Sequence, residues 1–158
     1  MANPPARLKG TPEEKKEQWK SYFSSLLGQP PKVPDDNFVV SQVSDHILPI
    51  EEGPFTPEEL RKAIRHTKRG GAVGIDCIPL EIWEDPYFSN YLLELCNLGL
   101  NQHLKPKQWS QSAIKPIPKK TNASLKQHRG ISLNSIAAKL YNKMLLNRIQ
   151  PYDDPILS

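Results

Sequence analysis

Proline is the strongest constraint on the fold of this chain, because 16 of its 158 residues are proline. That is about twice the usual share of about 5%, and each proline removes a backbone donor and fixes φ. The sequence therefore predicts short elements separated by many breaks. Its apolar content of 37% is sufficient for one core in a chain of this length.

Two of the prolines mark helix starts. Thr11-Pro12-Glu13-Glu14 and Thr56-Pro57-Glu58-Glu59 each combine a capping threonine, a first-turn proline and a glutamate that can complete a capping box. We expect the first helix to end at Gly28 and the second at Gly70-Gly71. The apolar positions at helical spacing are Trp19, Tyr22, Phe23, Leu26 and Leu27 in the first helix, and Leu60, Ala63 and Ile64, with Thr67 as a further candidate, in the second. The aromatic stripe of the first helix is interpreted as a packing face, with a base-stacking surface as the alternative.

The segments on either side of the second helix are irregular. Residues 29–54 are rich in proline and predict a linker with one extended stretch at residues 37–43. The connector Gly71-Ala72-Val73-Gly74-Ile75-Asp76-Cys77-Ile78-Pro79 has glycines like a phosphate-binding loop, but it lacks the Gly-Lys-Ser/Thr ending and a preceding strand. A structural turn, in which Asp76 accepts hydrogen bonds from nearby backbone amides, is the favoured interpretation.

The remaining elements are two helices, a strand pair and a last helix. A short helix is expected at residues 80–83, and a longer one begins at Asp85-Pro86 and should bury Phe88, Leu92, Leu95 and Leu98. Residues 112–118 and 128–133 are predicted strands that flank a polar loop at residues 121–127. The last helix should begin after Asn134 or Ser135, run to about Ile149, bury Ile136, Leu140, Met144 and Leu145, and expose Lys139, Lys143 and Arg148. The fold class is therefore α+β, mostly helical with one β-hairpin.

Charge is divided unevenly along the chain. Residues 95–152 contain no acidic residue and ten Lys or Arg, whereas the rest holds 11 basic and all 17 acidic residues. The basic block has a net charge of +10 and the remainder −6. A folded block with this charge indicates a polyanionic partner, nucleic acid or nucleotide phosphates. A merely solvated basic face is the alternative.

The predicted hairpin carries the residues best suited to binding phosphate. Lys119 and Lys120 supply compact ammonium charges, and Arg129 can hold two phosphate oxygens in a bidentate fork. Gly130 beside this arginine would let the backbone approach a ligand closely. A strand, a lysine-tipped loop and a return strand would together make a clamp for a polyphosphate.

Several other classes of protein are disfavoured. The apolar runs fall short of the ~20 residues that cross a membrane, and Met1-Ala2-Asn3-Pro4-Pro5 does not resemble a signal peptide. Cys77 and Cys96 do not form a disulfide framework and are expected to be free buried thiols. The four histidines, His46, His66, His103 and His128, are scattered and lack the spacing of metal ligands. A Gly-x-Ser-x-Gly nucleophile motif is also missing. We expect a nuclear or cytoplasmic protein without a membrane partner.

Four segments, in order and spacing, resemble the reverse transcriptases of non-LTR (LINE-like) retrotransposons, which are RNA-directed DNA polymerases. Trp19-Lys20-Ser21-Tyr22-Phe23-Ser24-Ser25-Leu26-Leu27 is similar to the helix that links their endonuclease to their polymerase. Residues 55–64 with 71–81 resemble the segment that opens the fingers region. Pro106-Lys107-Gln108-Trp109 with residues 114–120, and residues 129–133 with Lys139, resemble the two fingers motifs that follow. Each segment alone would be a weak match.

The resemblance implies roles for the basic residues. Arg129 and one of Lys119 or Lys120 would contact the triphosphate of the incoming deoxynucleoside triphosphate. Neighbouring cations would contact the RNA or DNA backbone of template and primer, and these are Lys115, Lys126, Lys139 and Lys143. The chain also departs from the family, which often has Tyr, Pro and Gly where His128, Gly130 and Cys77 stand, and usually Lys at Gly71. These departures leave room for a decayed copy.

The resemblance also implies what catalysis would need. In the family, carboxylates of the palm hold two metal ions that activate the primer hydroxyl. Tyr152-Asp153-Asp154 is not that signature, because Pro151 and Pro155 exclude the flanking strands. We therefore expect no catalytic or metal-binding residue here and an incomplete polymerase fold without palm and thumb, inactive alone, with Mg²⁺ belonging to the complete polymerase.

Three regions follow from these patterns: an amphipathic helix at residues 1–28, a Pro-rich linker at 29–55 and a partial fingers region at 56–158. The expected function is that of an N-terminal fragment of a LINE-like polymerase that contributes phosphate contacts. One alternative is a non-catalytic, basic nucleic-acid-binding protein derived from a retrotransposon. Another is transposon debris that folds poorly, with Ile136, Leu140 and Met144 exposed.

Overall fold

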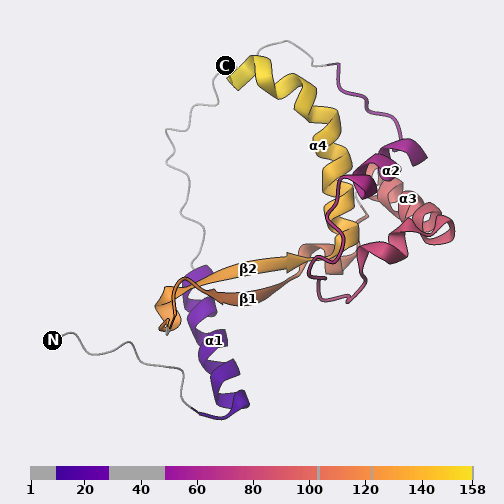
Figure 1. Ribbon diagram of the computed structural model, residues 1–158. Coiled ribbons are helices and arrows are strands. Elements are labelled where there is room, and N and C mark those ends of the chain that lie inside the picture. Colours follow the sequence, from indigo (N-terminus) through magenta and orange to yellow (C-terminus); the bar gives the residue numbers. More distant parts are fainter. Residues whose placement is uncertain (1–9, 29–48, 103, 122, 158) are drawn as a thin grey trace. The chain divides into compact units, whose positions relative to one another are not determined.

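The computed structural model describes residues 10–28, 49–102, 104–121 and 123–157 (Figure 1). The fold is α+β, as predicted, with four α-helices and a two-stranded antiparallel sheet in these residues. The helices are α1 (Pro12–Leu27), α2 (Pro57–Arg65), α3 (Pro86–Asn101) and α4 (Ile136–Leu157), and the strands are β1 (Ser112–Pro118) and β2 (His128–Asn134). Three short 3₁₀ helices join them: η1 (Leu80–Glu84), η2 (Lys107–Ser110) and η3 (Leu125–Gln127). The extended stretch expected at residues 37–43 lies outside the described residues.

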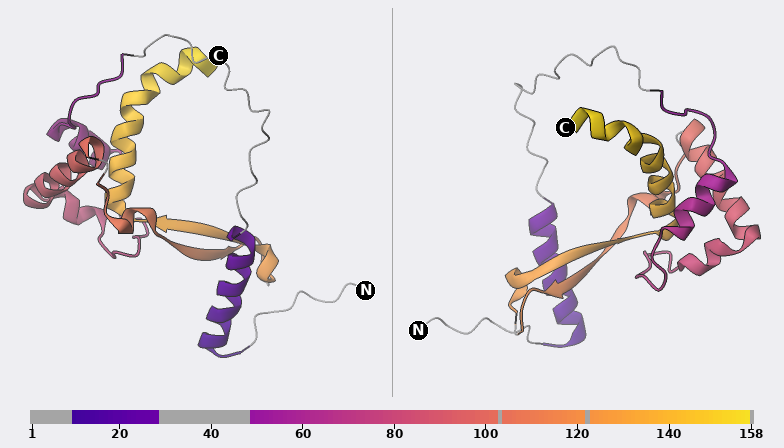
Figure 2. Two further views of the ribbon diagram at one scale, coloured as in Figure 1. Left: turned by 180° about the vertical axis from the view of Figure 1, so that it is seen from behind. Right: turned by 45° about the horizontal axis from the view of Figure 1, so that its top comes forward.

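The chain divides into two compact units. The first contains α1 and the outer part of the hairpin, Ile114–Ile131, and the second contains α2, α3, the base of the hairpin and α4. Figure 2 shows α1 beside the strands and α2 and α3 beside α4. Thus α1 and the hairpin, far apart in sequence, fold together. Within the described ranges, no helix has the length and apolar character that crossing a membrane requires.

Both predicted capping boxes are confirmed. The Thr11 hydroxyl accepts from the Glu14 amide at 3.3 Å, and the Glu14 carboxylate accepts from the Thr11 amide at 2.8 Å. Thr56 and Glu59 repeat the arrangement at 3.3 and 2.7 Å. Gly28 ends α1 as predicted, but the expected end of α2 at Gly70-Gly71 is wrong. That helix ends at Arg65, because the Thr67 hydroxyl and amide take the carbonyls of the last turn.

The core of the second unit lies among α2, α3, η1 and α4. The predicted buried faces of α2 (Leu60, Ala63, Ile64) and α4 (Ile136, Leu140, Met144) are confirmed, and Leu145 is partly buried.

The prediction for α3 is wrong at Phe88 and Leu98, which are exposed. Leu92 is buried as predicted, and the helix turns Cys96 and Gly99 inward in place of the other two. This face of α3 packs into the core that also contains Tyr141, and a Cβ at Gly99 would lie at an ordinary contact distance of 3.5 Å from that ring.

Arg148 departs most strongly from its predicted exposure. The residue was expected to face outward, but its side chain is only 7% exposed. Its Nε and Nη2 donate to the two carboxylate oxygens of Glu59 at 2.6 and 2.9 Å. Nη1 donates to the carbonyls of Glu51 and Gly53 at 2.9 and 2.6 Å, and Nη2 to that of Pro54 at 3.1 Å. This one side chain therefore joins α4 to the first turn of α2 and to the segment before it.

The expected end of α4 at Ile149 is also wrong, because the helix continues through Pro151 to Leu157. A proline inside a helix removes one backbone hydrogen bond. Contacts with other segments therefore support α4 before and after Pro151. Arg148 supplies contacts before the proline, and the Tyr152 hydroxyl donates to the Pro49 carbonyl at 2.8 Å after it. Figure 1 shows α4 curving along this C-terminal part.

Replacing Arg148 with methionine should lower the free energy of unfolding by about 3 kcal/mol, because the Glu59 carboxylate and three carbonyls lose a common donor. Chemical denaturation followed by circular dichroism measures the change. Arg65→Met is the matched control, since that arginine is 63% exposed in its ion pair and its loss should cost under about 0.5 kcal/mol. Equal effects of the two substitutions would contradict the anchoring role of Arg148.

The same pair should give stability a pH dependence. The hydrogen bond from Arg148 holds the pKa of Glu59 below its ordinary value of 4.5. A carboxyl whose pKa is lowered by folding stabilises the protein above its ordinary pKa, and the contribution is lost as the pH falls through the folded value. Denaturation between pH 6 and about 3 should therefore show a steeper loss of stability in the native protein than in Glu59→Gln. Parallel curves would contradict this assignment.

Candidate nucleic-acid interface

The predicted hairpin is present, with β1 at the predicted bounds and β2 one residue longer than predicted. Its register follows from two contacts. The Lys119 amide donates to the Gln127 carbonyl at 2.9 Å, and at the other end the Ser112 hydroxyl donates to the Asn134 side chain. In this register Ile117 lies opposite Arg129, and Lys115 lies opposite Ile131.

One face of the hairpin is covered by α1. A Cβ at Gly130 would lie 2.7 Å from Phe23 Cε1 and 3.1 Å from Ile114 Cγ2, so the Phe23 ring rests directly on the backbone of β2. The His128 and Trp19 rings form an edge-to-face contact, with 4.7 Å between the ring centroids. Gly130 was expected to admit a ligand, but in the structure it admits α1.

The aromatic stripe of α1 is confirmed as a packing face only in part. Phe23 is buried, whereas Leu26 and Leu27 are exposed. The face that contacts the hairpin is narrower than helical spacing predicted, because a two-stranded sheet offers α1 little surface.

The opposite face of the hairpin carries cations. Side chains alternate along a strand, so Lys115, Ile117, Arg129 and Ile131 share the face that lies away from Phe23. All four are exposed. Two charged side chains therefore stand beside two apolar ones on a surface that α1 leaves free.

The loop between the strands adds three more lysines. Lys119 and Lys120 follow β1, and Lys126 lies in η3. The loop is held by its own hydrogen bonds: the Ser124 amide donates to the Gln127 side chain at 3.1 Å, and the His128 ring nitrogen Nδ1 lies 2.8 Å from the Ser124 carbonyl. These contacts fix the loop at the point where it returns into β2.

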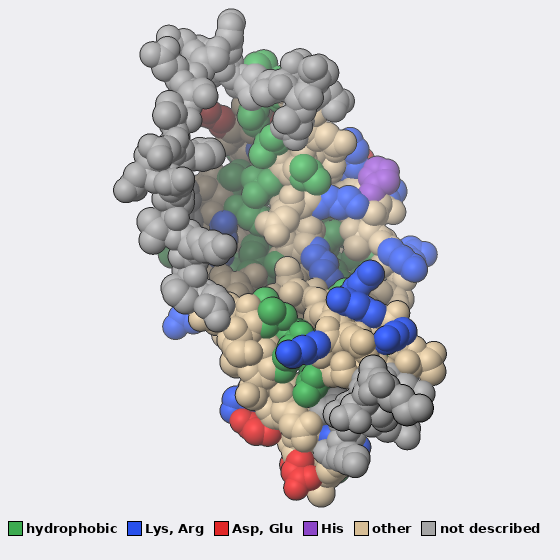
Figure 3. Space-filling model, turned by 90° about the vertical axis from the view of Figure 1, so that its left-hand side faces the viewer, with side chains coloured by type: hydrophobic (Ala, Val, Ile, Leu, Met, Phe, Trp, Pro, Cys, Tyr) green, Lys and Arg blue, Asp and Glu red, His purple; other side chains and the backbone are tan. Residues whose placement is uncertain are grey.

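None of these five cations forms an ion pair among the residues that the structure describes. All are exposed, and the sequence supplies no carboxylate between residues 95 and 152. Figure 3 shows one face of the molecule, on which Lys and Arg side chains gather around exposed hydrophobic ones. The hairpin therefore presents positive charge that no residue described in the structure neutralises.

The other two predicted contacts, Lys139 and Lys143, belong to the second unit. Both are half-buried on α4. The Lys143 ammonium group donates to the carbonyl of His66, just after α2 ends, so it stabilises the C-terminus of that helix. Five of the seven predicted phosphate contacts thus lie in one unit, and a nucleic-acid contact at Lys139 or Lys143 stays a prediction.

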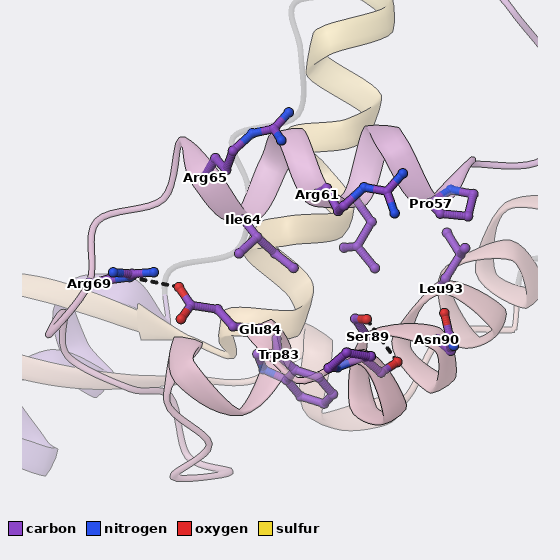
Figure 4. Close-up of a pocket in the computed structure, with 12 residues that line it drawn as sticks. Pro57, Arg61, Ile64, Arg65, Arg69, Trp83, Glu84, Ser89, Asn90 and Leu93 are labelled. Carbon is purple, nitrogen blue, oxygen red and sulfur yellow. Dashed lines mark hydrogen bonds and ion pairs between the residues drawn. The ribbon is translucent and has the colours of Figure 1, made fainter.

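A second basic cluster was missed by the sequence analysis. Arg61, Arg65 and Arg69 lie along a hollow of about 360 Å³ between α2 and the η1–α3 segment (Figure 4). The cluster lies in a part of the chain whose net charge is negative, so a charge count over long blocks does not reveal it. The one-turn spacing of Arg61 and Arg65 on a helix was a usable signal.

These arginines are paired, unlike the cations of the hairpin. Arg61 and Arg65 both bind the Glu58 carboxylate at 2.9 Å, and Arg69 binds Glu84 at 2.8 Å. The two arginines lower the pKa of Glu58, which keeps this carboxylate charged. A ligand anion would have to displace these carboxylates, so the hollow is a weaker anion site than the hairpin.

The connector between α2 and η1 is a structural turn, as predicted. Asp76 accepts a hydrogen bond from the Ile78 amide at 3.5 Å. A Cβ at Gly74 would lie 2.5 Å from the Ser135 backbone nitrogen, so this glycine allows the connector to pass the start of α4.

The two cysteines differ. Cys96 is buried as expected, and burial raises the pKa of its thiol to about 12. Cys77 is exposed, contrary to expectation, and its φ of 56° is a backbone angle that favours glycine. The turn directs the Cys77 side chain outward. Its left-handed backbone angle is one that glycine adopts more readily than cysteine does.

The described residues do not fit a metal ion, because they contain no group of three or more His, Cys, Asp or Glu able to hold one. Residues 152–154 lie in α4, so the sequence Tyr-Asp-Asp is not part of a strand pair, as expected from its prolines, although a helix at this position was not predicted.

Neither the comparison with family models nor the comparison with curated proteins gives a match for this chain. The resemblance to non-LTR reverse transcriptases stays a prediction.

Gly130→Ala tests whether α1 backs the hairpin. The added methyl group would clash with the Phe23 ring, and overpacking of this kind costs about 1–3 kcal/mol. We expect faster amide hydrogen exchange throughout α1 and at the hairpin. Gly71→Ala is the control, because the nearest atom to its Cβ is a carbonyl oxygen at 3.5 Å. Unchanged exchange in α1 would show that the contact contributes little.

Proposed function

We propose that this chain binds RNA or DNA through its β-hairpin, as part of the fingers of a LINE-like reverse transcriptase. The observation that carries the proposal is a set of five exposed cations on one hairpin that form no ion pair with any described residue: Lys115, Lys119, Lys120, Lys126 and Arg129. The order of the four sequence motifs supports the polymerase family.

The physical driving force is the release of counterions. A nucleic-acid backbone keeps condensed cations, and each phosphate neutralised by Lys or Arg releases part of them. Cations already paired with a carboxylate gain less, because the old ion pair must be given up first. The five hairpin cations have no ion pair with a described residue to break, whereas Arg61, Arg65 and Arg69 each have one.

The free face of the hairpin suits a single strand or the edge of a duplex. Arg129 can bind two phosphate oxygens at once, and Lys115 on the neighbouring strand can reach an adjacent phosphate. Ile117 and Ile131 between them offer apolar contact to sugars and bases. The loop lysines Lys119 and Lys120, at the end of β1, are the proposed contacts to the triphosphate of an incoming deoxynucleotide.

The face of the hairpin that α1 covers also supports the proposed binding, because it holds the two strands in place. An isolated two-stranded hairpin is marginally stable in water, and mobile strands would not hold five cations in a fixed pattern. The packing of Phe23 on Gly130 gives the hairpin a rigid back. The proposal therefore assigns α1 a supporting role, without contact to nucleic acid.

A non-catalytic nucleic-acid-binding protein is the second candidate function. The described residues favour it in one respect, because binding through phosphates needs none of the metal-ligating carboxylates that polymerisation needs. The two functions share the hairpin and differ in whether it recognises a triphosphate.

Salt dependence tests the shared part of the proposal. Changing Lys119, Lys120 and Arg129 together to alanine should flatten the plot of log K against log salt for single-stranded RNA by about 2, since each phosphate contact contributes about 0.7. The matched control changes Arg61, Arg65 and Arg69 to alanine, which removes the same charge but should leave the slope within error. Equal slopes for the two triple variants, or no RNA binding at 50 mM salt, would refute the proposed interface.

Competition by a deoxynucleoside triphosphate separates the two candidate functions in the same assay. A triphosphate site predicts that the nucleotide protects Lys119 and Lys120 from chemical acetylation and that Arg129→Ala abolishes the protection. Protection by RNA but not by the nucleotide would favour the non-catalytic function.

A further inference from the structure

The second unit carries a shallow hollow whose walls are aromatic and aliphatic, here called the aromatic groove. It measures about 630 Å³, and its lining contains no charged side chain. The residues that matter here are Pro79, Ile82, Trp83, Tyr87, Phe88 and Tyr91.

The groove remains open because α3 buries a different face. Leu92 and Cys96 point into the core, which leaves Tyr87, Phe88 and Tyr91 on the outside. Tyr87 is 77% exposed and Tyr91 is 62% exposed, one helical turn apart. Large exposed apolar patches of this kind mark binding surfaces in soluble proteins.

The charge around the groove is acidic, opposite to that of the hairpin. Residues 70–104 contain no Lys or Arg and five acidic residues, Asp76, Glu81, Glu84, Asp85 and Glu94. Arg69 neutralises one of them, Glu84. The remaining carboxylates lie next to the aromatic residues in the sequence, and Arg61 and Arg65, on the other side of Trp83, are paired with Glu58, so the groove favours a basic partner over nucleic acid.

The polar groups of the groove favour an extended partner. The Tyr87 and Tyr91 hydroxyls form no hydrogen bond with any described residue, so both are available to a ligand. Helical partners use their carbonyls internally, whereas a polyproline II chain has all its carbonyls free to accept. Proline also has no amide hydrogen, so it needs no acceptor from a groove that offers almost none.

We propose that the aromatic groove binds a basic, proline-rich peptide in the polyproline II conformation. Its prolines pack between the tyrosine rings and Pro79, in the way that proline-rich segments use aromatic grooves. Its carbonyls accept from the tyrosine hydroxyls, and its Lys or Arg side chains face the surrounding carboxylates and aromatic faces. The proposal is independent of the nucleic-acid function, because the two surfaces have opposite charge.

Fluorescence anisotropy with the full chain tests the inference. The probe is a labelled peptide of four Pro-Pro-Arg repeats, compared with Gly-Gly-Arg and Pro-Pro-Glu peptides of the same length. We expect the Pro-Pro-Arg peptide to bind at least about tenfold more tightly than either, since flexible glycine must be ordered on binding and glutamate is repelled. Equal binding of the Pro-Pro-Arg and Gly-Gly-Arg peptides would reduce the interaction to charge alone and overturn the proposal.

Substitutions in the groove complete the test. Tyr87→Ala with Tyr91→Ala should weaken the Pro-Pro-Arg peptide about tenfold or more, and the matching phenylalanine variants, which keep the rings, should weaken it less. Both tyrosines are exposed, so the fold should persist. An unchanged affinity would refute the site. Tyrosine-dependent binding of single-stranded RNA in place of the peptide, or tyrosine-dependent self-association, would assign the groove to a different occupant and likewise overturn it.

Discussion

The contact between Phe23 and Gly130 is the constraint on which the functional surface depends. A hairpin of two strands has no core of its own, so it needs another element to cover one face. Here α1 supplies that cover, and a side chain at position 130 would occupy the space of the Phe23 ring. The resulting arrangement is one-sided: an apolar contact behind the hairpin and lysine and arginine side chains in front.

Pairing, more than the number of charges, separates the surfaces of this protein. The arginines beside α2 form ion pairs with Glu58 and Glu84. Arg148 forms an ion pair with Glu59 and donates hydrogen bonds to backbone carbonyls. The hairpin lysines and Arg129 have no such partner among the described residues. One chain thus contains a basic surface, which we propose binds phosphates, and an aromatic surface next to carboxylates, which we propose binds a basic peptide. Neither competes for the ligand of the other.

The features that sequence predicted well depend on neighbouring residues alone. The capping boxes at Thr11 and Thr56 and the strands at Ser112–Pro118 and His128–Asn134 follow from local chemistry and spacing. The predictions were wrong where contacts with a segment distant in the sequence determine whether a residue is buried. Arg148 is buried because residues 51–59 provide its acceptors, and α3 buries Leu92 and Cys96 because that face packs into the core with Tyr141. The basic residues of the candidate site were found from charge, but which of them are unpaired requires the fold.

A nuclear magnetic resonance titration with a single-stranded RNA tests the central claim most directly, because it reports each amide separately. The account predicts chemical-shift changes at Lys115, Arg129 and the loop residues between the strands, at low salt and reversed by high salt. It predicts no change at the arginines of α2 or at Tyr87 and Tyr91. Shifts confined to the second unit, with the hairpin amides unmoved, would contradict it.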